Sequence, residues 1–184
     1  MQNSTTHKAH KFLAEVITKD DIVVDATMGN GYDTAFLARL CKNVFAFDVQ
    51  EEAVEATQER LDKSGLQATL IRDGHQNIDK YISAHVIKAA IFNLGYLPGS
   101  DKKVITQADT TVEALGKICG LLVHGGRIAV TVYPGHAGGK AESDAVLGFV
   151  KTLPAKKWRV EIKESEWKTD ESPYVVLIEL LLSV

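Results

Sequence analysis

The sequence predicts an α/β fold with a seven-stranded, mostly parallel sheet, an antiparallel strand pair at its C-terminal end, and helices on both faces. Three observations support this prediction. Short β-like runs alternate with longer helical patterns along the chain, as in parallel sheets that are covered by helices. Some of these runs are apolar almost throughout, which is typical of strands buried on both faces. The last two runs are separated only by residues 164–173, without a helical pattern, so we expect them to pair antiparallel.

Seven segments are expected to be strands. They are residues 21–26, 44–49, 68–72, 89–94, 127–133, 159–163 and 174–180. The first, fourth and fifth are nearly continuous apolar runs, which predicts that helices cover both of their faces. The sixth alternates between apolar and polar residues and therefore suits an edge of the sheet.

Apolar residues at helical spacing fill the gaps between these segments. The stripes consist of Phe12, Leu13, Val16 and Ile17; of Val54, Thr57 and Leu61; of apolar positions between 105 and 122; and of apolar positions between 141 and 150. Such stripes usually face a core rather than a ligand. Gly125-Gly126 is expected to turn the chain between the third stripe and the fifth strand.

Length and composition are ordinary for a soluble globular protein. The chain has 184 residues, of which 45% are hydrophobic and 24% charged, so we expect a single domain over residues 1–184. A net charge of −3 argues against a protein that coats nucleic acid by charge alone, but it is compatible with RNA binding through a local patch.

Two further expectations concern the cysteines and the membrane. Cys41 and Cys119 lie in apolar patterns without a CxxC motif or a histidine at ligand spacing, which favours buried thiols over a metal or redox pair. The polar N-terminus has no apolar signal core, and no apolar run is long enough to span a bilayer. We therefore expect a cytoplasmic protein without a membrane partner.

The first predicted strand leads directly into a glycine-containing loop, Asp25-Ala-Thr-Met-Gly-Asn-Gly-Tyr-Asp-Thr. Gly29 and Gly31 allow a tight turn and a close approach of the backbone to a ligand. Ligands of doubly wound sheets bind at the carboxyl ends of the strands, which makes this loop a candidate binding site. A lone GxG also occurs in ordinary βα turns, so whether this loop binds a ligand must be inferred from the residues around it.

Several polar residues favour S-adenosylmethionine over a dinucleotide at this loop. The third glycine of the dinucleotide fingerprint is replaced by Thr34, which disfavours NAD. Asp25, Asn30 and Asp33 surround the glycines. Their acidic groups would repel a pyrophosphate and attract the sulfonium and ammonium groups of S-adenosylmethionine. Asp33 is equally suited to cap a helix.

The next two strand ends offer partners for an adenosine. Asp48 closes the second strand, where a carboxylate can accept both ribose hydroxyls, and Gln50 can add a polar contact. After the third strand, Asp73 can accept from the adenine amino group, with His75 beside the ring. An alternative for His75 is a residue that starts a helix and binds no ligand.

The fourth and fifth strand ends carry candidates for the acceptor of the methyl group. Asn93 can accept an N–H bond and aim an amine, and Tyr96 can stack on a base. His136, which follows Tyr133-Pro-Gly, can take a proton near neutral pH. Alternatively, Asn93 only satisfies backbone groups at the strand end, Tyr96 only packs, and His136 is an ordinary surface histidine. No cluster of metal ligands at suitable spacing is present, so we expect no metal.

Three motifs together resemble the YtqB/MnmM family, whose older label is putative rRNA methylase. They are the loop from Asp25, Asn93-Leu-Gly-Tyr-Leu-Pro, and Thr131-Val-Tyr-Pro-Gly-His. The resemblance implies a Rossmann-like class I methyltransferase that uses S-adenosylmethionine. It also implies a homodimer that methylates 5-aminomethyl-2-thiouridine at the tRNA wobble position to 5-methylaminomethyl-2-thiouridine. By motif position it implies cofactor contacts at Asn30, Asp33, Asp48, Gln50 and His75, and a substrate end at Asn93, Tyr96, Tyr133 and His136.

An acidic protein that acts on tRNA needs local basic surfaces. Candidates are His7-Lys8, His10-Lys11, Lys102-Lys103, Lys140, Lys156-Lys157 and Arg159. A dimer would join two such patches into one surface, although single lysines are more often simply solvated. Other functions compatible with the sequence are a methyltransferase for rRNA or for a small-molecule amine, and a non-catalytic nucleotide-binding module, because a fold does not fix a function.

Overall fold

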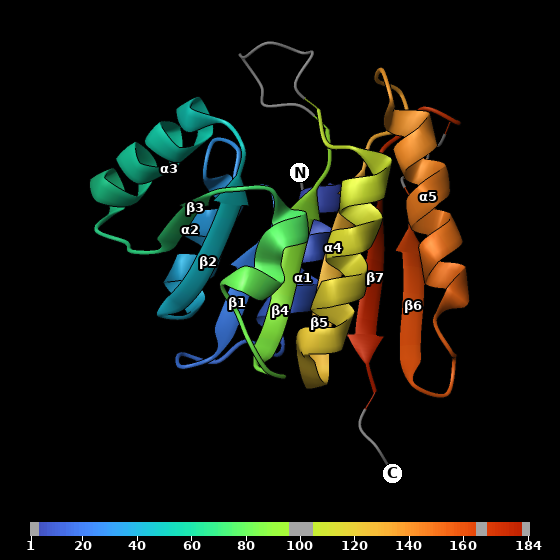
Figure 1. The fold of residues 1–184 in the computed structure, drawn as a ribbon, viewed down its shortest axis with the longest axis horizontal. Coiled ribbons are helices and arrows are strands. Elements are labelled where there is room, and N and C mark those ends of the chain that lie inside the picture. Colours follow the sequence, from blue (N-terminus) through green and yellow to red (C-terminus); the bar gives the residue numbers. More distant parts are fainter. Residues whose placement is uncertain (1–3, 96–104, 165–168, 182–184) are drawn as a thin grey trace.

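The structure is a computed structural model that describes residues 4–95, 105–164 and 169–181. Its strands form a seven-stranded sheet in the order β3-β2-β1-β4-β5-β7-β6 (Figure 1). Their bounds are β1 Ile22–Asp25, β2 Asn43–Asp48, β3 Thr69–Arg72, β4 Ile87–Asn93, β5 Leu122–Val132, β6 Trp158–Lys163 and β7 Tyr174–Leu180. All seven predicted strands are therefore present.

The pairing of the strands confirms the predicted topology. Strands β1 to β5 pair in parallel. Strand β7 runs antiparallel to both β5 and β6 and lies between them. As its alternating pattern predicted, β6 is an edge strand.

The predicted turn at Gly125-Gly126 is wrong. Strand β5 begins at Leu122, and its register against β4 shifts between the pairs Ile87–Leu122 and Ala89–Arg127. Gly125, with φ 70°, lies in this irregular stretch. The two glycines therefore accommodate surplus residues inside the strand, as in a β-bulge, and do not separate it from the preceding helix.

Six helical segments precede or connect the strands in the described part of the chain. They are α1 Thr5–Ala14, α2 Tyr32–Leu40, α3 Glu51–Ser64, the 3₁₀ helix η1 His75–Lys80, α4 Ala108–Leu121 and α5 Gly139–Thr152. Helix α1 begins where the Ser4 hydroxyl accepts the His7 N–H, and α3 ends at Gly65 in the left-handed conformation. Helix α1 ends before Val16 and Ile17, which the sequence pattern had placed within it.

The helices cover the two faces of the sheet. Figure 1 shows α4 and α5 in front of the strands and α1 behind them. Because neighbouring side chains of a strand point to opposite faces, Val23 packs with Leu13 of α1 and Leu37 of α2, while Val24 packs with Leu115 of α4. This arrangement explains why β1 is apolar along its length.

The cysteines and the helix lengths bear on two further expectations. Cys41 is buried, Cys119 is partly buried, and neither forms a disulfide. Burial raises the pKa of the Cys119 thiol to about 12. Among the described residues, no helix is both long enough and apolar enough to cross a membrane.

The strand order creates a crevice in the middle of the sheet. The chain proceeds outward from β1 to β3 in one direction and from β4 to β5 in the other. The chain therefore continues from these two adjacent strands toward opposite edges of the sheet. At such a switch point, open α/β sheets bind their ligands outside the carboxyl ends of the strands.

Candidate active site at the carboxyl ends of the strands

A cavity of about 790 Å³ lies at this switch point. It is lined by ten of the residues selected from the sequence: Gly29, Asn30, Asp33, Asp48, Gln50, Asp73, His75, Asn93, Tyr133 and His136. Tyr96 lies outside the described residues. The cofactor and substrate candidates thus border one continuous space.

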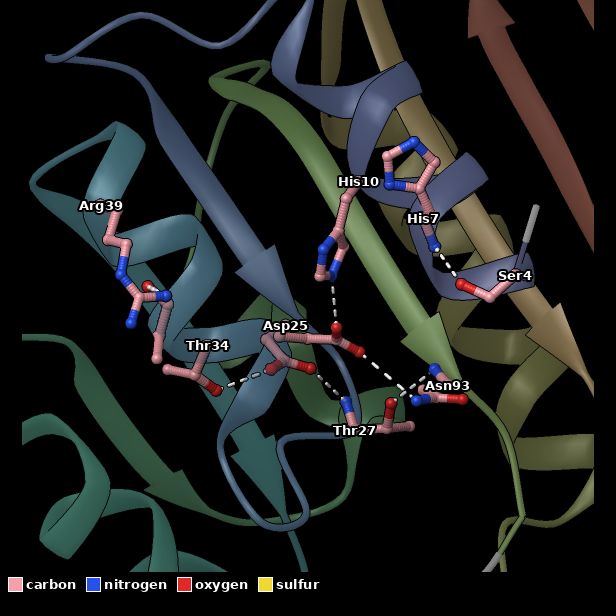
Figure 2. A network of polar contacts seen from close by, with 10 residues as sticks. Ser4, His7, His10, Asp25, Thr27, Thr34, Arg39 and Asn93 are labelled. Atoms are coloured by element: carbon pink, nitrogen blue, oxygen red, sulfur yellow. Dashed lines mark hydrogen bonds and ion pairs between the residues drawn. The ribbon is translucent and has the colours of Figure 1, made fainter. Parts of the chain in front are cut away.

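Asp25 lies behind the loop and does not line this cavity. Its carboxyl group is fully buried. It accepts the Thr34 hydroxyl at 2.6 Å and the Thr27 backbone N–H at 3.1 Å (Figure 2). Burial, followed by the nearby Asp33 carboxylate, raises the pKa of Asp25 to about 7. The structure therefore places Asp25 as a support of the loop, where the sequence analysis had expected a direct cofactor contact.

Helix α3 holds the loop from the other side. The Thr57 hydroxyl donates to the Gly29 carbonyl at 3.1 Å, and Arg60 Nε donates to the Asn30 carbonyl at 2.6 Å. Gly31 has φ 76° and precedes α2. A Cβ atom at this position would lie 2.9 Å from the Thr57 Cα. Gly31 therefore does not line the cavity. It allows the loop to pack closely against α3, and this close packing requires glycine.

Asp48 is fixed by backbone N–H groups. Its Oδ2 accepts from Gly29 at 3.1 Å and its Oδ1 from Gln50 at 3.0 Å. Burial raises the pKa of Asp48, and these hydrogen bonds oppose that shift. Each carboxylate oxygen has a further lone pair, so the group fits the two adjacent hydroxyls of a ribose.

The end of the cavity where the sequence predicts adenine contains a hydrogen-bond acceptor without a partner among the described residues. His75 Nδ1 donates to the Ala26 carbonyl at 3.0 Å, so Nε2 carries a lone pair, and it has no partner among the described residues. Burial lowers the pKa of His75 and keeps the ring neutral. An amino group of a bound adenosine would supply the missing donor.

Asp73 is already engaged at the same end. It accepts from Asn77 Nδ2 at 2.8 Å, from the Tyr81 hydroxyl at 2.9 Å and from the Gly74 N–H at 2.7 Å. The hydrogen bond from Asn77 contributes most to a lowered pKa. Asp73 is therefore an ionised, fixed group at the edge of the cavity.

A series of hydrogen bonds crosses the centre of the site. His10 Nε2 lies 2.6 Å from Asp33 Oδ1, and Asn93 Nδ2 donates to Asp33 Oδ2 at 3.5 Å. The Asn93 backbone N–H donates to the Thr27 hydroxyl at 2.7 Å. Figure 2 shows His10 reaching toward the loop while His7, on the same helix, points elsewhere.

His10 was misassigned from the sequence. We had grouped it with Lys11 and with His7-Lys8 in a surface basic face, but its ring stacks on Phe36 at 3.7 Å and pairs with Asp33. A contact between residues that are 23 positions apart leaves no local pattern in the sequence. Only the packing of α1 against α2 reveals it.

Tyr133 and His136 close the acceptor end. Their rings lie 6.3 Å apart. Burial, followed by the charge of Asp33, raises the pKa of Tyr133. A Cβ atom at Gly95 would lie 2.9 Å from His136 Nε2, so the glycine after β4 permits the histidine to approach this strand end.

A buried network that the sequence did not indicate holds the same end. The Gly95 N–H donates to the Thr106 hydroxyl at 2.9 Å, which donates to Glu142 Oε2 at 2.8 Å. Thr111 donates to the other oxygen of Glu142 at 2.7 Å. Burial raises the pKa of Glu142. The network ties β4, α4 and α5 together beneath the cavity.

Comparison with known proteins identifies relatives of the whole chain. Residues 44–179 match the family described as "Putative rRNA methylase". A chloroplastic tRNA (mnm(5)s(2)U34)-methyltransferase from Arabidopsis thaliana is 35% identical over 171 residues, which are 85% of this chain. The aligned part is 62% of the Arabidopsis protein, so this chain spans less than two thirds of that relative's length.

Solved structures show the same similarity. A putative rRNA-methylase from Clostridium thermocellum is 42% identical, with a TM-score of 0.92 over 97% of this chain and 98% of that one. A putative methyltransferase from Streptococcus mutans in complex with SAH, the demethylated form of S-adenosylmethionine, is 46% identical. Its TM-score is 0.90 over 98% of this chain and 100% of that one. S-adenosylmethionine is accordingly the cofactor, and the carboxylate of Asp48 and the ring of His75 are groups that suit its ribose and adenine.

Replacing Asp48 with alanine is expected to weaken binding of S-adenosylmethionine at least tenfold. The variant loses the hydrogen bonds that the ribose hydroxyls donate to a charged acceptor, which contribute roughly 1.5–3 kcal/mol each. Isothermal titration calorimetry measures the affinity, and thermal melting verifies folding. Asp62→Ala on the exposed side of α3 is the control for the change in net charge. Unchanged affinity in a folded Asp48→Ala protein would remove Asp48 from the site.

The raised pKa of Asp25 predicts a pH-dependent loss of stability. An unfolded aspartate loses its proton near pH 3.9, whereas the folded group keeps it until about pH 7. The folded state therefore binds more protons in this window, and stability falls as the pH rises. From pH 5 to pH 8, the wild type should lose about 2–3 kcal/mol more than Asp25→Asn. Urea unfolding at each pH measures this difference, and parallel curves for the two proteins would contradict the prediction.

Proposed function

The chain belongs to the rRNA methylase family and is an S-adenosylmethionine-dependent methyltransferase, and we propose that its substrate is a tRNA. Its target in this proposal is the aminomethyl nitrogen of 5-aminomethyl-2-thiouridine at the wobble position, and its product is 5-methylaminomethyl-2-thiouridine. The name of the Arabidopsis relative supports this choice. Because the chain spans only 62% of that protein's length, the shared substrate is part of the proposal.

The arrangement of the Asn93 amide carries the proposal. Its Nδ2 faces Asp33, so its carbonyl oxygen points away from that carboxylate. Asn93 lines the cavity together with Tyr133 and His136. A carbonyl oxygen at this place accepts an N–H bond from a primary amine and orients the nitrogen lone pair.

The chemistry divides between the cofactor and the protein. S-adenosylmethionine supplies a methyl group on a positively charged sulfur, and the leaving group is a neutral thioether. The protein must bind the amine in its neutral form or accept a proton from it, because a protonated amine has no free lone pair. In this proposal Asn93 orients the nitrogen, and His136 or a water molecule accepts the proton. Tyr133 and Tyr96 border the base.

The same proposal includes a cytoplasmic homodimer that joins basic surfaces of two copies. Among the described candidates, Lys140 pairs with Asp144 at 3.7 Å and Arg159 pairs with Glu179 at 2.7 Å. Lys156 and Lys157 are exposed and precede β6. Lys102-Lys103 lies outside the described residues.

A ribosomal RNA substrate is the second candidate. The name of the family and that of the Clostridium structure support it. A small-molecule amine is the third candidate, since a cavity of about 790 Å³ has room for one beside the cofactor. The SAH complex of the Streptococcus mutans relative favours an enzyme over a non-catalytic nucleotide-binding module.

Methyl transfer to bulk tRNA tests the proposal directly. The purified protein, with radiolabelled S-adenosylmethionine, should label tRNA from cells that lack the corresponding gene, but not tRNA from wild-type cells, whose target is already methylated. Nucleoside analysis should show the label in 5-methylaminomethyl-2-thiouridine. Ribosomal RNA from the same deletion cells is the parallel substrate. Label in rRNA alone would replace the tRNA proposal with the second candidate.

Replacing Asn93 with alanine should reduce kcat on the tRNA roughly 10- to 100-fold, because the nitrogen is no longer oriented toward the methyl group. The affinity for the cofactor should change little. Asn43→Ala is the control, because Asn43 lies at the amino end of β2, away from the carboxyl ends of the strands. Single-turnover kinetics gives the rate, and calorimetry gives cofactor binding. Equal rates for the Asn93 and Asn43 variants would exclude Asn93 from the reaction.

A further inference from the structure

We propose that His10 is a positioning residue of the methyltransferase reaction. It holds the Asp33 carboxylate in the orientation that turns the carbonyl oxygen of Asn93 toward the substrate amine. This inference rests on the proposed function of Asn93. It adds a residue of the N-terminal helix to a site that is otherwise built from the loops after the strands.

The first step is the fixation of His10 itself. Its ring is parallel to the Phe36 ring within 1°, with the ring centroids 3.7 Å apart. Its side chain is only 22% exposed. The imidazole of α1 thereby lies against α2, with Nε2 directed at Asp33. Stacking and hydrogen bonding together determine the orientation of the ring.

The second step is the need of Asp33 for a donor. Its side chain is 7% exposed, and a buried carboxylate is costly unless hydrogen bonds replace its lost water. His10 supplies a contact at 2.6 Å to Oδ1. The contact of Oδ2 with Asn93 is much longer, at 3.5 Å. The short contact therefore fixes where the carboxylate lies, and the long one follows from it.

The third step leads from Asp33 to Asn93. An ionised carboxylate only accepts hydrogen bonds, so it faces the NH₂ end of the amide and not its carbonyl end. Thr27 fixes the backbone of Asn93 at 2.7 Å but leaves the amide free to rotate by 180°. Asp33 decides between the two rotamers, and it does so only while His10 keeps it in place.

Tyr133 provides a second link between α1 and the acceptor end. Its pKa is raised by burial first and by the charge of Asp33 next, and a hydrogen bond with Thr5 of α1 opposes the shift. Helix α1 thus contacts two groups that line the cavity. The family match covers residues 44–179, so neither His10 nor Asp33 lies within it. The role of His10 is inferred from the geometry of this chain.

Three variants of the full chain test the inference. His10→Phe retains a ring that can stack on Phe36 but removes the donor. His10→Gln places an amide N–H near the position of Nε2 and is the conservative rescue. His7→Phe, an exposed position on the same helix, is the matched control. Each is measured for melting temperature, SAH affinity, and kcat and KM with tRNA from the deletion cells.

The expected result is a loss of kcat without a loss of folding. His10→Phe should lower kcat roughly 10- to 100-fold, with the melting temperature within about 2 °C and SAH affinity within about threefold of the wild type. His10→Gln should recover most of the rate, and His7→Phe should match the wild type. Should His10→Phe not fold, the comparison of His10→Gln with His10→Leu replaces it, with the slower rate expected for leucine.

Two outcomes would overturn the inference. One is wild-type kcat in a folded His10→Phe or His10→Leu protein. The other is a slow variant whose rate glutamine does not restore, or whose melting temperature and SAH affinity fall together with kcat, because either result describes a purely structural residue. A wild-type protein that fails to methylate the tRNA contradicts the proposed function instead. The two failures are therefore distinguishable.

Discussion

The buried carboxyl group of Asp25 is the interaction on which the site depends. It joins the end of β1 to the beginning of α2, because it accepts from Thr27 on one side of the loop and from Thr34 on the other. Thr27 in turn accepts the Asn93 N–H at the end of β4. One carboxyl group thus sets the distance between the cofactor loop and the acceptor end. Asp25 therefore does not line the cavity itself, but it holds in place the loop that does.

The cofactor loop concentrates acidic groups where water is scarce. Asp25, Asp33 and Asp48 are close enough that both neighbours raise the pKa of Asp25. Such clusters destabilise a folded protein and are typical of functional sites. The His10 donor next to Asp33 offsets part of this cost. A cationic ligand offsets more of it, because its charge interacts favourably with carboxylates in a poorly solvated cavity. Repulsion among these carboxylates and the attraction of a sulfonium would therefore have the same origin.

The sequence predicted those features that depend on neighbouring residues. Apolar runs located the strands, and the lack of a helical sequence pattern in residues 164–173 predicted the antiparallel pair. Asp48 and His75 could be selected because a strand end and a ligand site coincide in this architecture. The contacts of His10 with Asp33 and of Thr106 with Glu142 could not be predicted, because they join segments 23 and 36 residues apart. The role of Asp25 was missed because a loop aspartate and a buried support look alike in sequence.

Asp33 belongs to both halves of the site, and this position has a chemical consequence. It borders the glycine loop that we assign to the cofactor, and it contacts the amide of Asn93, which we assign to the substrate. A carboxylate at this place would stabilise the charge of a bound sulfonium before methyl transfer, and the charge of the methylated ammonium after it. In our proposal His10 fixes Asp33, so the same carboxylate would serve both charges without a reorganisation of the protein.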